Sequence, residues 1–182
     1  LYFVAATNFV NYKDVSADQQ ARVAEMLTKL DQNTFNTIKE SALTDYKGFF
    51  DRVNLTLPTT PSSFLPTDER LTNAQNNPDP QLATLCYNFG RYLLISSAWD
   101  SKYTTNINIQ MNYWAVESGN LSELSEPLTT MIKELTDQGS QVAKEHYGAK
   151  GWVFHQNTDL WRTAAPMDGP TWGTFTVGGA WL

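Results

Sequence analysis

The sequence predicts a mainly α-helical protein with one short strand at its N-terminal end. Apolar residues recur at intervals of three and four through several long segments, as they do along one face of a helix. Hydrophobic residues make up 41% of the 182 residues, which is enough to build a core. Weak alternation over residues 1–12 predicts the strand.

The first helix is predicted to follow a turn at Lys13-Asp14. From about Ala17 the apolar residues change to helical spacing, and Ser16 or Asp18 can cap the helix. The residues expected on its inner face are Val23, Met26, Leu27 and Leu30. A second helix is predicted over residues 34–53, with a similar stripe made of Ile38, Ala42, Tyr46, Phe49 and Val53.

Residues 54–66 contain three prolines and no periodicity, so they are predicted to form a loop. Asp79 and Pro80 then supply an N-cap and a proline at the first helical position. The stripe expected to be buried in this helix consists of Leu82, Leu85, Phe89 and Leu93.

A further long helix is predicted from about Glu126 to Tyr147. Its expected inward residues are Leu128, Met131, Ile132, Leu135 and Val142. Amphipathic helices joined by polar connections indicate helix-on-helix packing. Residues 148–178 follow neither a helical nor a strand period and are rich in Gly, Pro, Trp, His and Asp, which is typical of a functional segment.

Charge and composition argue against several partners. A net charge of -6 makes a nucleic-acid partner unexpected, because phosphate binding needs clustered Lys and Arg. The longest apolar stretch, around residues 93–95, is too short to cross a bilayer, so no membrane partner is expected. The single cysteine, Cys86, excludes an intrachain disulfide, and its place on an apolar helical face predicts a buried thiol rather than a nucleophile.

The densest group of polar residues lies between Thr105 and Trp114. If the backbone is extended there, Asn106, Asn108 and Gln110 project from the same side. Carboxamides donate and accept hydrogen bonds at once, which suits the hydroxyls of a neutral sugar. The alternative is that these amides satisfy the backbone of a loop, and the residues alone favour neither.

A second polar group contains His155 and Asp159. A zinc site needs at least three ligands and His146 is the only other histidine, so no metal is expected. No G-x-S-x-G elbow surrounds a serine, and no phosphate-binding loop occurs, so no cofactor is expected. Carboxylates for glycoside hydrolysis are available, but for any one of them a helix-capping or surface role is the more common one. They are Asp68, Glu69, Glu117, Asp159 and Asp168.

Several motifs, taken in order, resemble glycoside hydrolase family 95. They are Ala5-Ala6-Thr7-Asn8-Phe9-Val10-Asn11-Tyr12, Leu65-Pro66-Thr67-Asp68-Glu69-Arg70-Leu71, Phe89-Gly90-Arg91-Tyr92-Leu93-Leu94-Ile95-Ser96-Ser97, Asn106-Ile107-Asn108 through Trp114, His155-Gln156-Asn157-Thr158-Asp159-Leu160-Trp161, and Gly178-Gly179-Ala180-Trp181-Leu182. Each is weak alone, but together they are highly specific and cover almost the whole chain.

The resemblance implies the N-terminal part of an (α/α)6-barrel catalytic domain. Residues 1–12 would be the last strand and linker of a preceding β-sandwich region, and residues 13–182 part of the barrel. The implied reaction is hydrolysis of terminal α-1,2-linked L-fucose with inversion, or of α-L-galactosides as in some members. The Asn-x-Asn pair carries over to Asn106 and Asn108, and Asn108 would be the base.

The family also pairs its amide base with an aspartate and uses a separate glutamate as the acid, and both lie downstream of this chain. The rest of the same polypeptide is therefore expected to complete the barrel. Neither residue 1, a Leu, nor the final Leu182 looks like a natural end, so both ends are expected to be cut. The family resemblance also implies a longer loop before Trp99, where only Ala98 stands here. Either an active-site loop is lost, or two pieces are joined across a gap.

Two hypotheses follow for function. The first is an inverting α-L-fucosidase, extracellular or secreted, or periplasmic if bacterial, acting on fucosylated oligosaccharides or glycans. The second is a sugar-binding or structural remnant without turnover. The residues expected to bind substrate are His155, Trp172, Trp181 and Asp159, which can position hydroxyls and stack on the sugar. Their alternative role is to tie down residues 148–178, and for Asp159 and Trp161 we favour that structural role.

Overall fold

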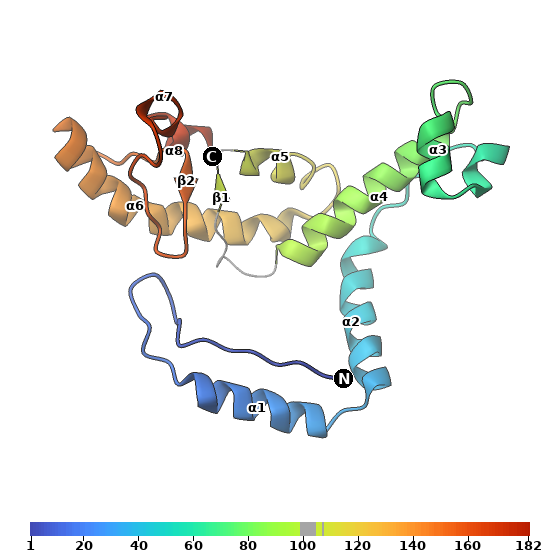
Figure 1. Ribbon diagram of the computed structural model, residues 1–182, viewed down its shortest axis with the longest axis horizontal. Coiled ribbons are helices and arrows are strands. Elements are labelled where there is room, and N and C mark those ends of the chain that lie inside the picture. Colours follow the sequence, from blue (N-terminus) through green and yellow to red (C-terminus); the bar gives the residue numbers. More distant parts are fainter. Residues whose placement is uncertain (99–104, 107) are drawn as a thin grey trace.

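The computed structural model describes residues 1–98, 105–106 and 108–182, and for residues 105 and 106 it describes the backbone. The described chain is mainly helical, as predicted. Along the chain α2 connects α1 to α4, α6 carries the C-terminal segment, and the N-terminal segment returns to α6, where the Tyr12 hydroxyl donates to the Asp137 carboxylate at 2.7 Å (Figure 1). None of the described helices combines the length and apolar character that a bilayer crossing requires.

The strand predicted for residues 1–12 is wrong. The described residues there form only an isolated bridge between Asn11 and Asp14. A strand needs a neighbouring strand to satisfy its backbone, and here a side chain of α1 and the backbone just before that helix do so instead. The Arg22 guanidinium donates to the carbonyl oxygens of Thr7 and Phe9 at 2.8 and 2.7 Å, and the Ala17 N–H donates to that of Asn8 at 3.1 Å.

The first two predicted helices are confirmed as α1 (Gln19–Asp31) and α2 (Phe35–Phe50). Asp18, one of the two predicted caps, accepts hydrogen bonds from the N–H groups of Gln20 and Ala21 at 2.9 and 3.0 Å. Those two N–H groups have no partner within the helix, so the carboxylate fixes where α1 begins. No residue of either helix is fully buried.

The predicted loop contains a short 3-10 helix, η1 (Pro61–Phe64), and α3 (Thr67–Asn73) follows it. Asp79 precedes α4 (Pro80–Ser97), as predicted, but its carboxylate binds the Arg70 guanidinium at 2.7 Å and accepts from the Ser63 hydroxyl at 3.0 Å. The hydrogen bond from Arg70 lowers the pKa of Asp79. The ion pair therefore joins η1, α3 and the start of α4.

The stripe predicted to be buried on α4 is wrong. Leu85, Phe89 and Leu93 are exposed, and α4 instead buries Arg91, Leu94 and Ile95. Helical periodicity identified the helix, but α2 packs against the face that carries the arginine. The prediction for Cys86 is wrong for the same reason, since the thiol lies on the exposed side.

The last long helix, α6 (Glu126–Tyr147), is confirmed, and Gly148 ends it in the left-handed conformation with φ 60°. The α6 cluster is the buried group Ile109, Leu128, Met131, Leu135, Val142, Ala143, Val153, Phe154 and Ala164. The α4 cluster is Leu94, Ile95, Ala98, Val116, Leu121 and Leu124. Tyr113 packs against both clusters and so joins the two halves of the described structure.

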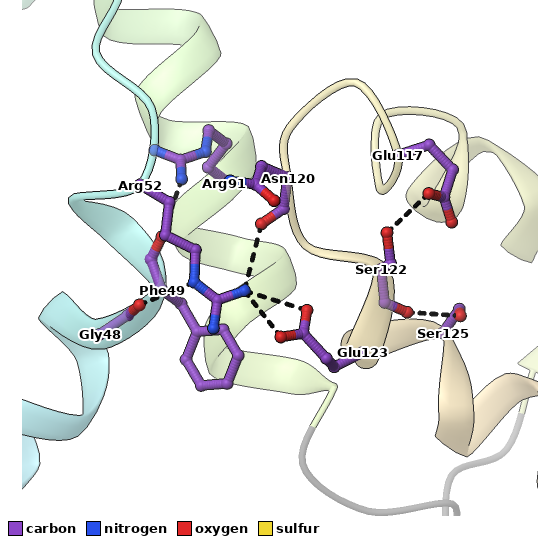
Figure 2. A network of polar contacts seen from close by, with 9 residues as sticks. All are labelled: Gly48, Phe49, Arg52, Arg91, Glu117, Asn120, Ser122, Glu123 and Ser125. Atoms are coloured by element: carbon purple, nitrogen blue, oxygen red, sulfur yellow. Dashed lines mark hydrogen bonds and ion pairs between the residues drawn. The ribbon is translucent and has the colours of Figure 1, made fainter.

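Two arginines hold the C-terminal end of α2 (Figure 2). Arg91, 3% exposed, donates to the carbonyl oxygens of Phe50, Phe49 and Val53 at 2.8, 3.0 and 3.2 Å. Arg52 binds the Glu123 carboxylate at 2.8 Å, next to the 3-10 helix η2 (Ser122–Ser125). Carbonyls at a helix end lack their usual partner within the helix, and Arg91 supplies a donor to those of Phe49 and Phe50; Phe49 also accepts from the Arg52 N–H at 3.3 Å.

Replacing Arg91 with Ala is expected to lower the free energy of unfolding by about 3 kcal/mol, because the carbonyl oxygens lose their donor inside the protein. Arg52→Ala is the control. Its side chain is 30% exposed, so the loss should stay below about 1 kcal/mol. Urea denaturation of both variants measures the difference, and equal losses would contradict the capping role of Arg91.

Candidate active site

A two-residue antiparallel ladder joins the two polar motifs. Strand β1 (Thr105–Asn106) pairs with β2 (Asn157–Thr158), with Thr105 opposite Thr158 and Asn106 opposite Asn157. Figure 1 shows this ribbon beside α6, with α5 and α8 close to its ends. Residues about fifty positions apart in the sequence are thereby brought together.

The predicted row of three amides is wrong. Asn108 has helical dihedral angles, φ -84° and ψ -1°, and α5 (Ile109–Tyr113) begins directly after it. Extended backbone therefore ends before Asn108, and Gln110 lies in the first turn of α5, where it is buried. Asn108 itself is exposed at the N-terminal end of α5. Asn108 and Gln110 therefore do not project together from one side of an extended segment.

Buried polar atoms without partners gather at this ribbon. The three oxygens Gln156 Oε1, Asn157 Oδ1 and Thr158 Oγ1 are all buried, and so is Gln110 Nε2, with no hydrogen-bond partner in the described structure. Each such atom costs about 1–3 kcal/mol, so a cluster of them is expected where a polar ligand or a further part of the protein supplies partners. The amide-rich sequence was the only signal for this feature.

His155 precedes β2 by two residues and is fully buried, at 0% exposure. Its Nδ1 accepts a hydrogen bond from the Phe175 N–H at 3.0 Å, and its Nε2 lies 3.1 Å from the Tyr147 hydroxyl. Because a backbone N–H can only donate, Nδ1 must be unprotonated, and the neutral ring carries its hydrogen on Nε2. Burial, followed by the neighbouring His146, lowers the pKa of His155.

Asp159 follows β2 and uses its carboxylate to close a turn. Oδ1 accepts from the N–H groups of Trp161 and Thr163 at 2.9 and 3.1 Å, and Oδ2 accepts from the Thr163 hydroxyl at 2.9 Å. Burial opposes ionisation, but the hydrogen bonds from Thr163 and Trp161 bring the pKa below its ordinary value. The geometry is that of a structural turn.

Two tryptophans lie on short helices near the C-terminal end of the chain. Trp172, on α7 (Pro170–Gly173), is 61% exposed, and Trp181, on α8 (Gly178–Trp181), is 59% exposed. Both helices begin in the irregular segment that the sequence predicted to be functional. The described structure thus exposes both indole rings while it buries His155.

Comparison with known proteins gives the family. The model of the glycosyl hydrolase family 95 catalytic domain matches residues 34–98 and 97–182, which together make up most of the chain. The chain belongs to glycosyl hydrolase family 95. The second matched part, residues 97–182, contains both Asn106 and His155.

Curated family 95 relatives are similar over most of this chain. Alpha-L-fucosidase 2 of Arabidopsis thaliana is 32% identical over 93% of the chain, and probable alpha-fucosidase A of Aspergillus niger is 30% identical over all of it. A protein of the same name from Aspergillus oryzae is 28% identical over 74%. The chain spans 23% and 27% of the length of the first two relatives.

The family 95 match is divided at one place. Its two parts meet at residues 97 and 98, where the sequence indicated a shortened loop. The alignment with the Aspergillus niger relative spans 213 positions against the 182 residues of this chain, so at least 31 positions have no counterpart here. The junction between Ala98 and Trp99 lies outside the described residues.

The contact between α8 and the segment before β2 leaves no room for a side chain at Gly178. A Cβ there would lie 2.4 Å from the Phe154 carbonyl oxygen and 2.5 Å from that of His155. Gly178→Ala is therefore expected to lower the free energy of unfolding by about 1–3 kcal/mol through overpacking.

Gly90→Ala is the matched control, because no atom lies within 4 Å of a Cβ at this position in α4. Alanine is the better helix former there, so the variant should gain up to about 1 kcal/mol. Chemical denaturation of both variants gives the comparison. A loss at Gly90 equal to that at Gly178 would show that the close contact has no energetic role.

Proposed function

We propose that this chain is part of an inverting α-L-fucosidase and carries the amide pair of its active site. The observation that supports this most strongly is the β1–β2 ladder, which joins the Asn106–Asn108 motif to the segment from His155 to Asp159. In this proposal residues 13–182 form part of an (α/α)6 barrel, and the rest of the same polypeptide completes it. The protein acts outside the cell.

Asn108 is the proposed base. An exposed carboxamide can accept a hydrogen bond from the attacking water, while Asn106 helps to hold that water beside the anomeric carbon. A carboxamide is a poor base alone, so a carboxylate must polarise it and a second carboxyl group must protonate the leaving oxygen. In an inverting enzyme about 6.5–9.5 Å separates acid and base, which leaves room for the water.

Those carboxyl groups are expected outside this chain. Asp159 is the carboxylate in the described structure that lies nearest in sequence to β2, and its hydrogen bonds to Thr163 and Trp161 already occupy both oxygens. A general acid must be free to protonate its substrate, which this geometry does not favour. The proposed aspartate and glutamate therefore belong to the remaining polypeptide.

The sugar subsite is proposed to be formed by Trp172 and Trp181, with His155 and Asp159 behind it and out of contact with the sugar. The exposed indole rings of the two tryptophans suit the apolar face of a fucosyl ring, and the other two residues support the segments that present them. The preferred substrate is terminal α-1,2-linked L-fucose on an oligosaccharide or glycan. An α-L-galactoside, which carries one more hydroxyl, is the alternative within the family.

A second candidate function is sugar binding without turnover. The divided match at residues 97 and 98 favours it, because a shortened segment precedes the catalytic amides directly. Hydrogen bonds between sugar hydroxyls and the unpartnered oxygens of Asn157 and Thr158 in β2 need neither an acid nor a base. Both candidates predict fucose binding, so turnover distinguishes them.

Replacing Asn108 with Ala in the full-length protein is expected to reduce the kcat for fucose release from a 2′-fucosylated oligosaccharide by about a hundredfold or more, because the water loses its base. Asn112→Ala is the matched control: this asparagine is also exposed on α5 and should change kcat less than about twofold. Unchanged turnover in the Asn108 variant would exclude its role as base.

The 182 residues alone are expected to release no fucose from the same substrate, because the proposed acid lies elsewhere in the polypeptide. The measurement compares fucose release by this chain and by the full-length protein at equal concentration. Hydrolysis by the 182 residues would exclude the binding-only function and the external acid together. Inactivity of the full-length protein, with fucose binding retained, would support the binding-only function.

A further inference from the structure

We propose that His155 acts as a positioning residue, which holds the segment carrying Trp172 and Trp181 in place without touching the sugar itself. This inference rests on the proposed function, in which the two tryptophans form part of the sugar subsite. It gives His155 a role that depends on one ring nitrogen, Nδ1, as an acceptor.

The first support is that both ring nitrogens are already occupied. Nδ1 accepts from the Phe175 N–H at 3.0 Å, and Nε2 donates to the Tyr147 hydroxyl at 3.1 Å. The ring has no exposed surface with which to reach a ligand. Since Phe175 lies between Trp172 and Trp181, the Nδ1 bond fixes the backbone that connects the two tryptophans.

The second support is the close packing of α8 on the backbone at His155. A Cβ on Gly178 would meet the carbonyl oxygens of Phe154 and His155, and one on Gly179 would lie 2.6 Å from the Trp152 ring. Leu182 packs against the α6 cluster. The start of α8 therefore packs against the segment that leads into β2, while Trp181 is exposed to solvent.

The consequence concerns the protonation state of His155. A proton on Nδ1 would place two hydrogens against each other, one on the ring and one on the Phe175 N–H. Burial and the neighbouring His146 lower the pKa of His155, so the neutral ring is the folded form. The other titratable group that faces the ring is Tyr147, and residues 172–182 contribute none.

The sign of the pH effect follows from that direction. With a folded pKa below the ordinary value of 6.5, the contribution of His155 is fully present above pH 6.5. It is lost as pH falls from 6.5 toward the folded pKa, because the opened segment binds the proton more readily. Acidification should therefore release residues 172–182 before it unfolds the protein.

Two substitutions in the full-length protein distinguish the role of the His155 Nδ1 atom from that of Nε2. In His155→Asn the side-chain oxygen stands near the place of Nδ1 and can still accept from Phe175, whereas in His155→Gln the amide reaches toward Tyr147 instead. Tyr147→Phe is the control. Tyr147 is 45% exposed, so water can replace its hydroxyl beside Nε2.

Two readouts are needed. Hydrogen exchange of the peptide containing residues 172–182 reports the positioning itself, and KM against kcat on a 2′-fucosylated oligosaccharide reports its effect on the site. We expect His155→Gln to speed the exchange and to raise KM about fivefold to tenfold, with kcat changed less than about twofold. His155→Asn and Tyr147→Phe should stay near the unmodified protein in both readouts.

The outcomes are distinct. Equal behaviour of the Asn and Gln variants, or an effect on kcat in place of KM, would overturn the positioning role.

If His155→Gln does not fold, the pH dependence of exchange in the other proteins tests the positioning role instead. Relative to an unstructured peptide at the same pH, the protection of residues 172–182 against exchange should fall below pH 6.5 in the unmodified protein and stay constant in His155→Asn, and the same fall in both would overturn the role. If hydrogen exchange behaves as expected but the full-length protein has no fucosidase activity, the proposed function is wrong and the positioning role of His155 is still supported.

Discussion

The pairing of Asn106 with Asn157 is the constraint on which the candidate site depends. A ladder of two residue pairs is marginal by itself, because it buries little apolar surface. Here the surrounding core stabilises it. The residue after Asn108, Ile109, belongs to the α6 cluster, and so do Val153 and Phe154, which lead into β2. Because both strands are attached within a few residues to this cluster, the α6 cluster favours the observed pairing.

A similar dependence links the other half of the described structure to this core. Arg91 and Arg52 attach the end of α2 to α4 and to the segment around Glu123, and Tyr113 packs against both clusters. On the outer side of α4, Leu85, Phe89 and Leu93 are exposed at intervals of four residues. In the proposed function, the rest of the polypeptide packs against such faces.

The sequence allowed the helices to be predicted wherever the signal was local. The Asp18 cap, the Asp79-Pro80 pair and Gly148 act on the nearest turn of the backbone, so α1, α4 and α6 begin or end close to the expected residues. Two predictions that depended on distant partners were wrong. Residues 1–12 form no strand because Arg22 and Ala17 bind their carbonyl oxygens. The buried face of α4 was missed because a buried arginine is not part of a hydrophobic pattern.

The candidate site shows the same limit. The ladder pairs the backbone of Asn106 with that of Asn157, which lies two residues from both His155 and Asp159. The division of tasks among these residues depends on hydrogen bonds across twenty residues, which no local pattern encodes. His155 binds Phe175 and Asp159 binds Thr163, so both are committed to holding the backbone, while Asn108 and the two tryptophans are exposed. In the proposed function, the chemistry therefore uses exposed groups from this chain and carboxylates from the rest of the polypeptide.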